Sequence, residues 1–304
     1  MIQLELDRQV ASAAAGLAGQ LAQRAAGHVA AVVFYGSALG DGALDGVLDF
    51  YVLVDRVRDW PGPRLAALAN RLLPPNVGYL ECCIDGQSLR AKYAVMSLAQ
   101  FCQRMSARTI DTSLWARFSQ PCACVWARSA ADRAAVAGAV QQAVITAASW
   151  AAKLGPESGS ARDFWHALFA RTYRAELRIE GTARGADLVA RDAGRYARLL
   201  PAAWIAAGIE FDATGNGTLH PRLSQPARAA AGRRWWLRRR SGRPLNLLRL
   251  IKAAFTFDGA MDYAVWKIER HAGVRVELRP WQRRHPLLAA PCLYWRLRRL
   301  GLLR

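Results

Sequence analysis

The sequence predicts an α/β fold in which a mixed sheet is followed by a helical region and a basic C-terminal region. Three observations support this prediction. Short, β-branched apolar runs such as 32–35 and 48–54 alternate with helical patterns early in the chain. Alanine-rich helical patterns dominate the middle. From Arg222 onward, the sequence contains 20 lysines and arginines but only four acidic residues. This excess of 16 positive charges accounts for most of the net charge of +19.

A chain of 304 residues with 53% hydrophobic content is long enough for more than one compact core. We expect three consecutive parts. A mixed-sheet domain covers residues 1–130, a helical domain covers 131–232, and a basic amphipathic region covers 233–304.

The stretch 31–55 carries the strongest functional signal. An apolar run ends at Gly36-Ser37, a glycine-rich loop follows, and a second apolar run carries Asp49 near its start. Glycine lets backbone approach a phosphate without a Cβ clash, and serine adds hydrogen-bond donors. An aspartate can hold a divalent cation against the same triphosphate. This pattern is typical of nucleotidyltransferases, and an ordinary strand-to-helix corner is the alternative.

The common form of this motif reads Asp-x-Asp, but Tyr51 occupies the second position here. Another carboxylate must then complete a metal site. A hairpin predicted over 79–96 offers Asp85 as that ligand and Lys92 as a phosphate contact. Asp55 lies further along the second strand, on the same face, and is a weaker metal candidate. A solvated hairpin end with unrelated charges is the alternative.

Helical spacing of apolar residues and flanking Gly or Pro predict the remaining elements. Helices are expected at 3–26, 64–73, 97–107, 131–153, 163–180, 187–207, 245–257 and 261–271, with Pro201 interrupting the sixth.

The basic C-terminal quarter should bind a polyanion. Arginines interleaved with tryptophans could stack on bases and neutralise phosphates, or could lie on an anionic bilayer. Leucine outnumbers every residue in the tail that could read a base, which favours the membrane, and no nucleic-acid partner is expected. A solvated basic face of a helical domain remains an alternative.

Cysteine spacing and the N-terminal residues bear on location. The six cysteines form no CxxC pair, which suits a reducing compartment. Glu5 and Asp7 fit neither a secretory nor a transit sequence. The stretch 134–152 approaches the membrane-spanning length of about 20 residues but is mostly alanine with polar interruptions, so we expect a packed helix. The chain should therefore be soluble or peripheral.

Taken in order, these segments resemble the mitochondrial-type phosphatidate cytidylyltransferases, the translocator assembly and maintenance family, in a bacterial form. The matching stretches are Tyr35–Ala38, Leu48–Asp55, Asp85-Gly86 with Leu89–Ser97, Ser119–Pro121, Ala148–Ala151 and Leu168–Arg178. The resemblance covers roughly residues 30 to 205, and family members are similar in lacking the second Asp beside the first. The chain differs from the family pattern at Asp41 and Gly42 and in its more basic, tryptophan-bearing C-terminal quarter.

The resemblance implies a polymerase-beta-like nucleotidyltransferase domain, a winged-helix-like helical domain and a membrane-attaching C-terminal region. The implied reaction joins CTP and phosphatidic acid to give CDP-diacylglycerol and pyrophosphate, with Mg²⁺. Gly36 and Ser37 would hold the triphosphate, Asp49 and Asp85 the metal, and Lys92 a phosphate. Candidates for the lipid headgroup are Arg238, Arg239, Arg240, Arg249 and Lys252. The expected location is cytoplasmic, peripheral on the inner face of the bacterial cell membrane.

Two other functions remain open at this point. A nucleotidyltransferase acting on RNA or a small hydroxyl acceptor would keep the same site and use the basic region for nucleic acid. A non-catalytic membrane-binding protein on a decayed nucleotidyltransferase fold would explain Tyr51 and the basic tail together.

Overall fold

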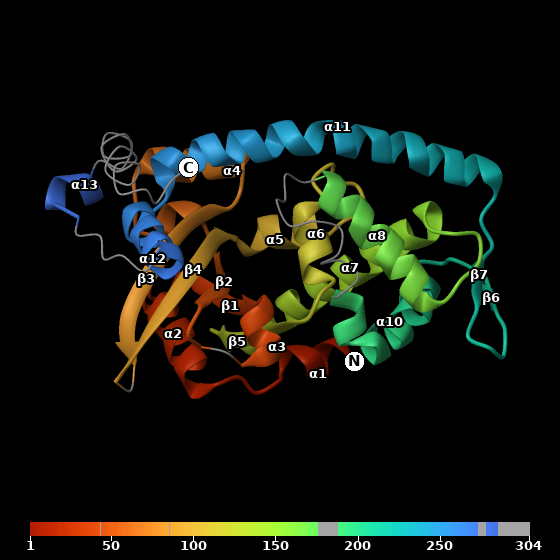
Figure 1. Ribbon diagram of the computed structural model, residues 1–304, viewed down its shortest axis with the longest axis horizontal. Coiled ribbons are helices and arrows are strands. Elements are labelled where there is room, and N and C mark those ends of the chain that lie inside the picture. The colour runs from red at the N-terminus through yellow and green to blue at the C-terminus, as the bar shows by residue number, and fades with distance from the viewer. Residues whose placement is uncertain (43, 85, 176–187, 273–277, 285–304) are drawn as a thin grey trace. The chain divides into compact units, whose positions relative to one another are not determined.

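The computed structural model describes residues 1–42, 44–84, 86–175, 188–272 and 278–284 (Figure 1). The chain divides into two compact units, and both are discontinuous in sequence. The sheet unit comprises residues 8–97, 123–128 and the described residues from 248 on. The helical unit comprises residues 1–7, 98–122 and the described residues of 129–247. The sequence predicts three consecutive parts instead, because pattern alone does not show which distant segments pack together.

A five-stranded mixed sheet forms the centre of the sheet unit, in the order β3-β4-β2-β1-β5. Its strands are β1 Val29–Tyr35, β2 Val47–Val54, β3 Asn76–Ile84, β4 Gln87–Ser97 and β5 Cys122–Ala127. Strands β1 and β2 pair antiparallel, β2 and β4 pair parallel, and β3 and β4 form the predicted antiparallel hairpin. The fold is therefore mixed α/β, as the sequence predicts.

Helices of the sheet unit are α2 Ser12–Gln23, α3 Ser37–Asp41, α4 Arg64–Leu72 and α12 Ala260–Ala272, with the short α13 Pro280–Arg284 and the 3₁₀ turn η1 Val57–Asp59. Side chains alternate between the two faces of a strand. One face carries Phe34, Phe50 and Val52, which form the core together with Leu17 and Leu21 of α2. The opposite face is more polar towards one end, and α12 contacts β3.

Helices of the helical unit are α1 Ile2–Leu6, α5 Leu98–Arg104, α6 Ser113–Phe118, α7 Ala130–Leu154, α8 Ala161–Ala175 and α10 Ala193–Ala206, and the hairpin β6 Phe211–Ala213 with β7 Leu219–Pro221 completes it. Helix α7 is the core helix, and the Ser129 hydroxyl caps its N-terminus by accepting from the Asp132 amide. The buried Trp204 indole donates to Ala148 O at 2.8 Å. Whether this unit is a winged-helix domain stays a prediction.

Two proline positions differ from expectation. Helix α10 runs through Pro201 instead of being interrupted there. Helix α11, Gln225–Thr256, likewise contains Pro244 and begins 20 residues before the predicted helix at 245. A proline removes one backbone donor and does not end a helix when neighbouring packing holds the turn. Residues up to Leu247 of α11 belong to the helical unit, and those from Leu248 belong to the sheet unit.

One described helix, α7, is long and apolar enough to cross a membrane by length and composition. In its most apolar stretch, 61% of the residues are buried inside the protein, as is common for the core helix of a globular unit. Its buried residues include Trp150, and the buried Thr146 hydroxyl donates to Met105 O at 2.7 Å.

Candidate nucleotide site

Asp49, Lys92 and Tyr35 lie next to one another on three neighbouring strands. Asp49 of β2 is in register with Lys92 of β4 on one side and with Tyr35 of β1 on the other. Registered residues on adjacent strands project from the same face, and the strands are about 4.8 Å apart. Both Asp49 and Lys92 are half-buried. The structure thus brings together a carboxylate and an ammonium that the sequence assigns to one site.

The Gly36-Ser37 corner lies directly beside Asp49. Gly36 has φ +97°, a region that side-chain-bearing residues rarely adopt, and a Cβ built there would lie 3.2 Å from Asp49 Oδ2. Ser37 is exposed and begins the short helix α3. Glycine therefore allows the backbone to turn closely around the carboxylate and leaves the Ser37 hydroxyl at the surface. The structure places Gly36 against Asp49, and the role of these residues in a site stays a prediction.

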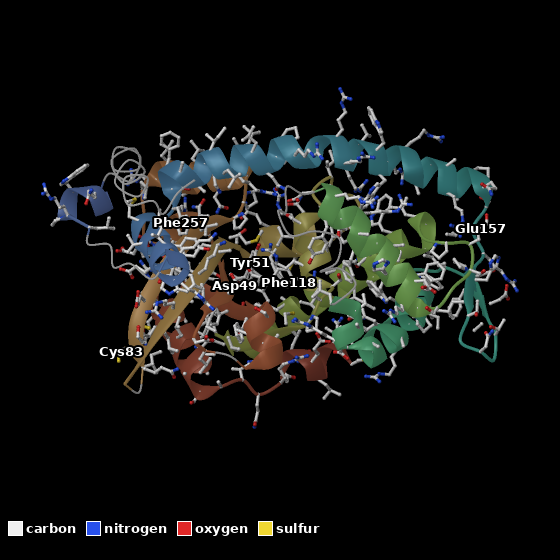
Figure 2. The ribbon with its side chains drawn as sticks, viewed as in Figure 1. Asp49, Tyr51, Cys83, Phe118, Glu157 and Phe257 are labelled. Carbon is white, nitrogen blue, oxygen red and sulfur yellow. The ribbon has the colours of Figure 1, made fainter. Side chains whose placement is uncertain are left out.

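Tyr51 fills the place where a second aspartate would stand. Its side chain extends from β2 two residues beyond Asp49, on the same face (Figure 2). The residue is only 3% exposed, and its ring lies 5.4 Å from the Tyr35 ring, centroid to centroid. Among the described residues, no group of three or more His, Cys, Asp or Glu could hold a metal ion. At this position the structure therefore has a buried ring that packs on Tyr35.

Helix α12 supplies residues that the sequence analysis missed. The Tyr263 ring lies 5.5 Å from the Tyr79 ring, and Lys92 Nζ lies 5.7 Å from the Tyr263 centroid. Burial raises the pKa of the Tyr263 hydroxyl, and the nearby Asp49 charge raises it further. The cluster around Asp49 therefore includes a phenol from a distant part of the chain.

Trp266 and Arg270 continue the same helical stripe. The Trp266 ring stacks on Tyr263 at 6.2 Å, and the Arg270 guanidinium lies 5.3 Å from the Trp266 centroid. A Cβ built on Gly46, just before β2, would lie 3.5 Å from Arg270 Nη1. Residues 263, 266 and 270 share one helix face, because they are spaced by three and four. That spacing is visible in the sequence and could have pointed to them.

Arg90 and Glu81 form a separate ion pair on the hairpin. Their shortest N–O distance is 2.9 Å, and Glu81 also accepts from the Ser88 hydroxyl at 3.0 Å. The pKa of Tyr79 is raised, mainly by burial and secondly by the charge of Glu81. Arg90 is thus held within the hairpin. It lies two residues before Lys92 on β4, on the same face of the strand.

Asp55 is not brought to Asp49. It follows the other end of β2, six residues on, or about 20 Å along an extended strand. Both of its carboxylate oxygens accept from Arg128, at 2.7 and 3.0 Å, and Arg128 also donates to Gly27 O. Hydrogen bonding from Arg128 lowers the pKa of Asp55. Asp85, the other predicted metal ligand, lies outside the described residues.

The predicted headgroup residues differ in their surroundings. Lys252 donates to Leu73 O, Pro75 O and Asn76 Oδ1 at 2.5–3.0 Å, and Arg249 donates to Pro74 O at 3.2 Å. Burial and the charge of Arg249 lower the pKa of Lys252 to about 8. These two cations hold the turn between α4 and β3.

Arg238 is also used within the protein, because it donates to Ala107 O at 2.6 Å and lies 4.4 Å from the Trp150 ring centroid. Arg239 and Arg240 are exposed on α11, with Arg240 lying 5.4 Å from the exposed Trp236 ring. Of the five predicted headgroup residues, these two remain at the surface. The basic patch available to an outside anion is therefore smaller than the sequence indicates.

Compared with models of known protein families and with curated protein sequences, the chain has no match.

Proposed function

We propose that the sheet unit carries a nucleotidyltransferase site that transfers CMP from CTP to phosphatidic acid, giving CDP-diacylglycerol and pyrophosphate. One observation supports the proposal most: the Gly36 backbone lies against the Asp49 carboxylate, and Lys92 is in register with Asp49 on the next strand. A triphosphate needs backbone donors without a Cβ clash and a nearby cation, and this corner offers both. The cytidine and the lipid acceptor come from the sequence resemblance alone.

The reaction needs positioning and charge neutralisation. A phosphomonoester oxygen of the acceptor attacks the α-phosphorus, a new P–O bond forms, and the bond to the bridging oxygen breaks. The electron pair leaves with pyrophosphate. A phosphomonoester is largely dianionic at neutral pH, since its second pKa is about 6, so no general base is required. Gly36 and Ser37 would hold the departing phosphates, and Lys92 would offset their growing charge.

Magnesium, when bound, would neutralise part of the triphosphate charge. Asp49 is the described carboxylate placed to share the ion with phosphate oxygens and water. The described residues include no group of three or more metal-binding side chains. Among the described residues, Asp49 would hold the ion together with phosphate oxygens of the nucleotide.

The acceptor defines where the protein would work. Phosphatidic acid lies in a bilayer, so the site must meet a membrane surface, which we propose is the inner face of a bacterial cell membrane. The positive charge of the C-terminal quarter is complementary to anionic lipid. The protein would bind there peripherally from the cytoplasm.

An assay that measures transfer of label from a nucleotide into the lipid phase tests this proposal. Purified protein is incubated with Mg²⁺, phosphatidate vesicles and each of the four nucleoside triphosphates, labelled in the base. We expect label in the lipid phase from CTP and far less from the others. The Asp49→Asn variant should lose the activity, while Asp55→Asn, which changes the same residue type just after the same strand, should retain it. Label in added RNA, or no lipid label from any nucleotide, would contradict the proposal.

A further inference from the structure

Residues 249–256 of α11 contact the segment that contains helix α4, within the sheet unit (Figure 1). Lys252 and Arg249 donate to carbonyls at the C-terminal end of α4 and just beyond it. At the other end, Pro63 and Ala66 line the same pocket as Phe255 and Thr256. Residues 249–256 therefore contact the turn after α4 and share a pocket with the start of α4.

Both segments direct polar side chains inward and apolar side chains outward. In α4, Asn70 is fully buried and donates to Val95 O at 2.9 Å, whereas the leucines of the helix are exposed. In α11, Lys252 is 9% exposed, whereas its neighbour Ile251 is 50% exposed. The exposed leucines of α4 and the buried Lys252 of α11 differ from an ordinary surface helix, where apolar residues face the core and charged residues face water.

We call the exposed apolar residues of these two segments the α4–α11 surface. It consists of Leu65, Leu68, Leu72, Leu248, Leu250, Ile251 and Phe255, each between 48% and 77% exposed. Leu65, Leu68 and Leu72 follow helical spacing, so they share one face of α4. A cluster of large exposed side chains on two adjacent helices is a feature of interaction sites, unlike scattered single leucines.

Within α4 and residues 248–256, the charged residues have one sign. Arg64 and Arg71 are exposed on α4, and neither α4 nor 248–256 contains an acidic residue. Leucine and phenylalanine at the acyl boundary with arginine among the headgroups is the arrangement of a protein that lies on an anionic membrane. A protein partner of matching shape would need a largely acidic rim.

We propose that the α4–α11 surface binds an anionic bilayer, with its leucines and Phe255 at the acyl boundary and Arg64 and Arg71 among the headgroups. This proposal rests on the proposed function, because it names the surface through which the proposed membrane enzyme contacts the bilayer. It assigns membrane contact to a helix from the first quarter of the chain. It also gives Arg249 and Lys252 the role of holding the two helices together.

Vesicle flotation without nucleotide tests the surface. The probes are vesicles of phosphatidylcholine alone and of phosphatidylcholine mixed with phosphatidylglycerol; neither contains phosphatidate. We compare the full chain with L65S/L68S/L72S. The matched control is L4S/I110S/I205S, which removes three exposed apolar side chains from the helical unit.

The wild-type chain should float with the anionic vesicles. The α4 variant should lose at least about tenfold in partition, since leucine burial at the acyl boundary is removed. The control should float like wild type, and melting curves should show all three chains folded. If the α4 variant does not fold, R64E/R71E replaces it and should lower binding to anionic vesicles. Because the vesicles contain no phosphatidate, a failed transferase assay leaves this result unaffected.

Three outcomes would overturn the proposal. The wild-type chain could fail to float with anionic vesicles, or the α4 variant could float as well as the control. The third is found by sedimentation: a wild-type dimer that L65S/L68S/L72S converts to monomer, with vesicle binding unchanged, would show that a second copy of the chain covers the surface.

Discussion

The two ends of β2 each carry an aspartate, and their surroundings differ. Asp49 lies near the start of the strand, against the Gly36 backbone, in register with Lys92 and close to Tyr263. Asp55 follows the end of the strand and forms a bidentate ion pair with Arg128, which also donates to Gly27 O. One carboxylate lies among groups suited to bind phosphate, and the other joins two segments of the fold.

The comparison shows that position on a strand face does not define a site. Asp49 and Asp55 differ by an even number of residues and share a face, yet about 20 Å of strand separates them. We propose a role in transfer for Asp49, whereas Asp55 joins two segments of the fold through Arg128. Variants at the two ends should therefore affect different measurements.

The largest effect is expected for Asp49→Asn. The change keeps the shape of the side chain and removes its charge, so CMP transfer to phosphatidate should fall by about 100-fold or more. The variant should remain folded, because asparagine keeps the size and shape of aspartate. Transfer rates and thermal melts measured on the same preparation check this, with Asp55→Asn as control. Full activity in Asp49→Asn would remove Asp49 from the site.

The Lys92→Met variant comes next. Transfer should fall by about 30-fold, mostly in kcat, because Lys92 would offset charge that grows on the leaving phosphates. Arg90→Met is the matched control, since Arg90 lies on the same strand face but pairs with Glu81 at 2.9 Å. Steady-state kinetics with varied CTP separates the two variants. Equal losses of transfer activity in the two variants would mean that transfer depends on the intact hairpin and not on the Lys92 charge in particular.

A smaller loss is expected for Gly36→Ala. The new methyl group must adopt φ +97° and approach Asp49 Oδ2 to 3.2 Å, so both the corner and the carboxylate should shift. We expect about tenfold lower transfer and a stability loss of about 1 kcal/mol. Gly40→Ala is the control, because a Cβ there meets nothing within 4 Å and no positive φ is required. Urea unfolding and the transfer assay measure the two effects, and an unaffected Gly36→Ala would contradict close backbone approach to the nucleotide.

The smallest effect is expected for Asp55→Asn. Its ion pair is about 40% exposed, so the loss should be about 0.5–1 kcal/mol at pH 7, with transfer within about twofold of wild type. Because the folded state lowers the pKa of Asp55, this stabilisation is present above the unfolded pKa of about 3.9 and is lost as pH falls through the folded pKa. Urea unfolding of both proteins at pH 7 and pH 3 should show the difference closing in acid. A constant difference would mean that Asp55 contributes through something other than its charge.

Much of the sheet unit could be predicted from the sequence. The β-branched runs around Gly36-Ser37 predict β1 and β2, and the Asp85-Gly86 turn predicts the β3–β4 hairpin, because strand period and turn chemistry are local properties. Tyr51 could likewise be recognised as a departure from Asp-x-Asp. The nearness of Gly36 and Asp49 followed from the antiparallel pairing of two consecutive strands, in which Tyr35 is in register with Asp49. These predictions needed no information about distant residues.

Other features were decided by tertiary packing. The contact of Tyr263 with Lys92 joins residues more than 170 positions apart, and no local pattern specifies it. Charge alone made Lys252 and Arg249 look like headgroup ligands, but a buried cation must satisfy its donors, and the carbonyls after α4 do so. With those polar groups turned inward, the leucines of α4 and α11 face outward. Sequence shows which residues are apolar or charged, whereas packing decides which of them the fold leaves for a partner.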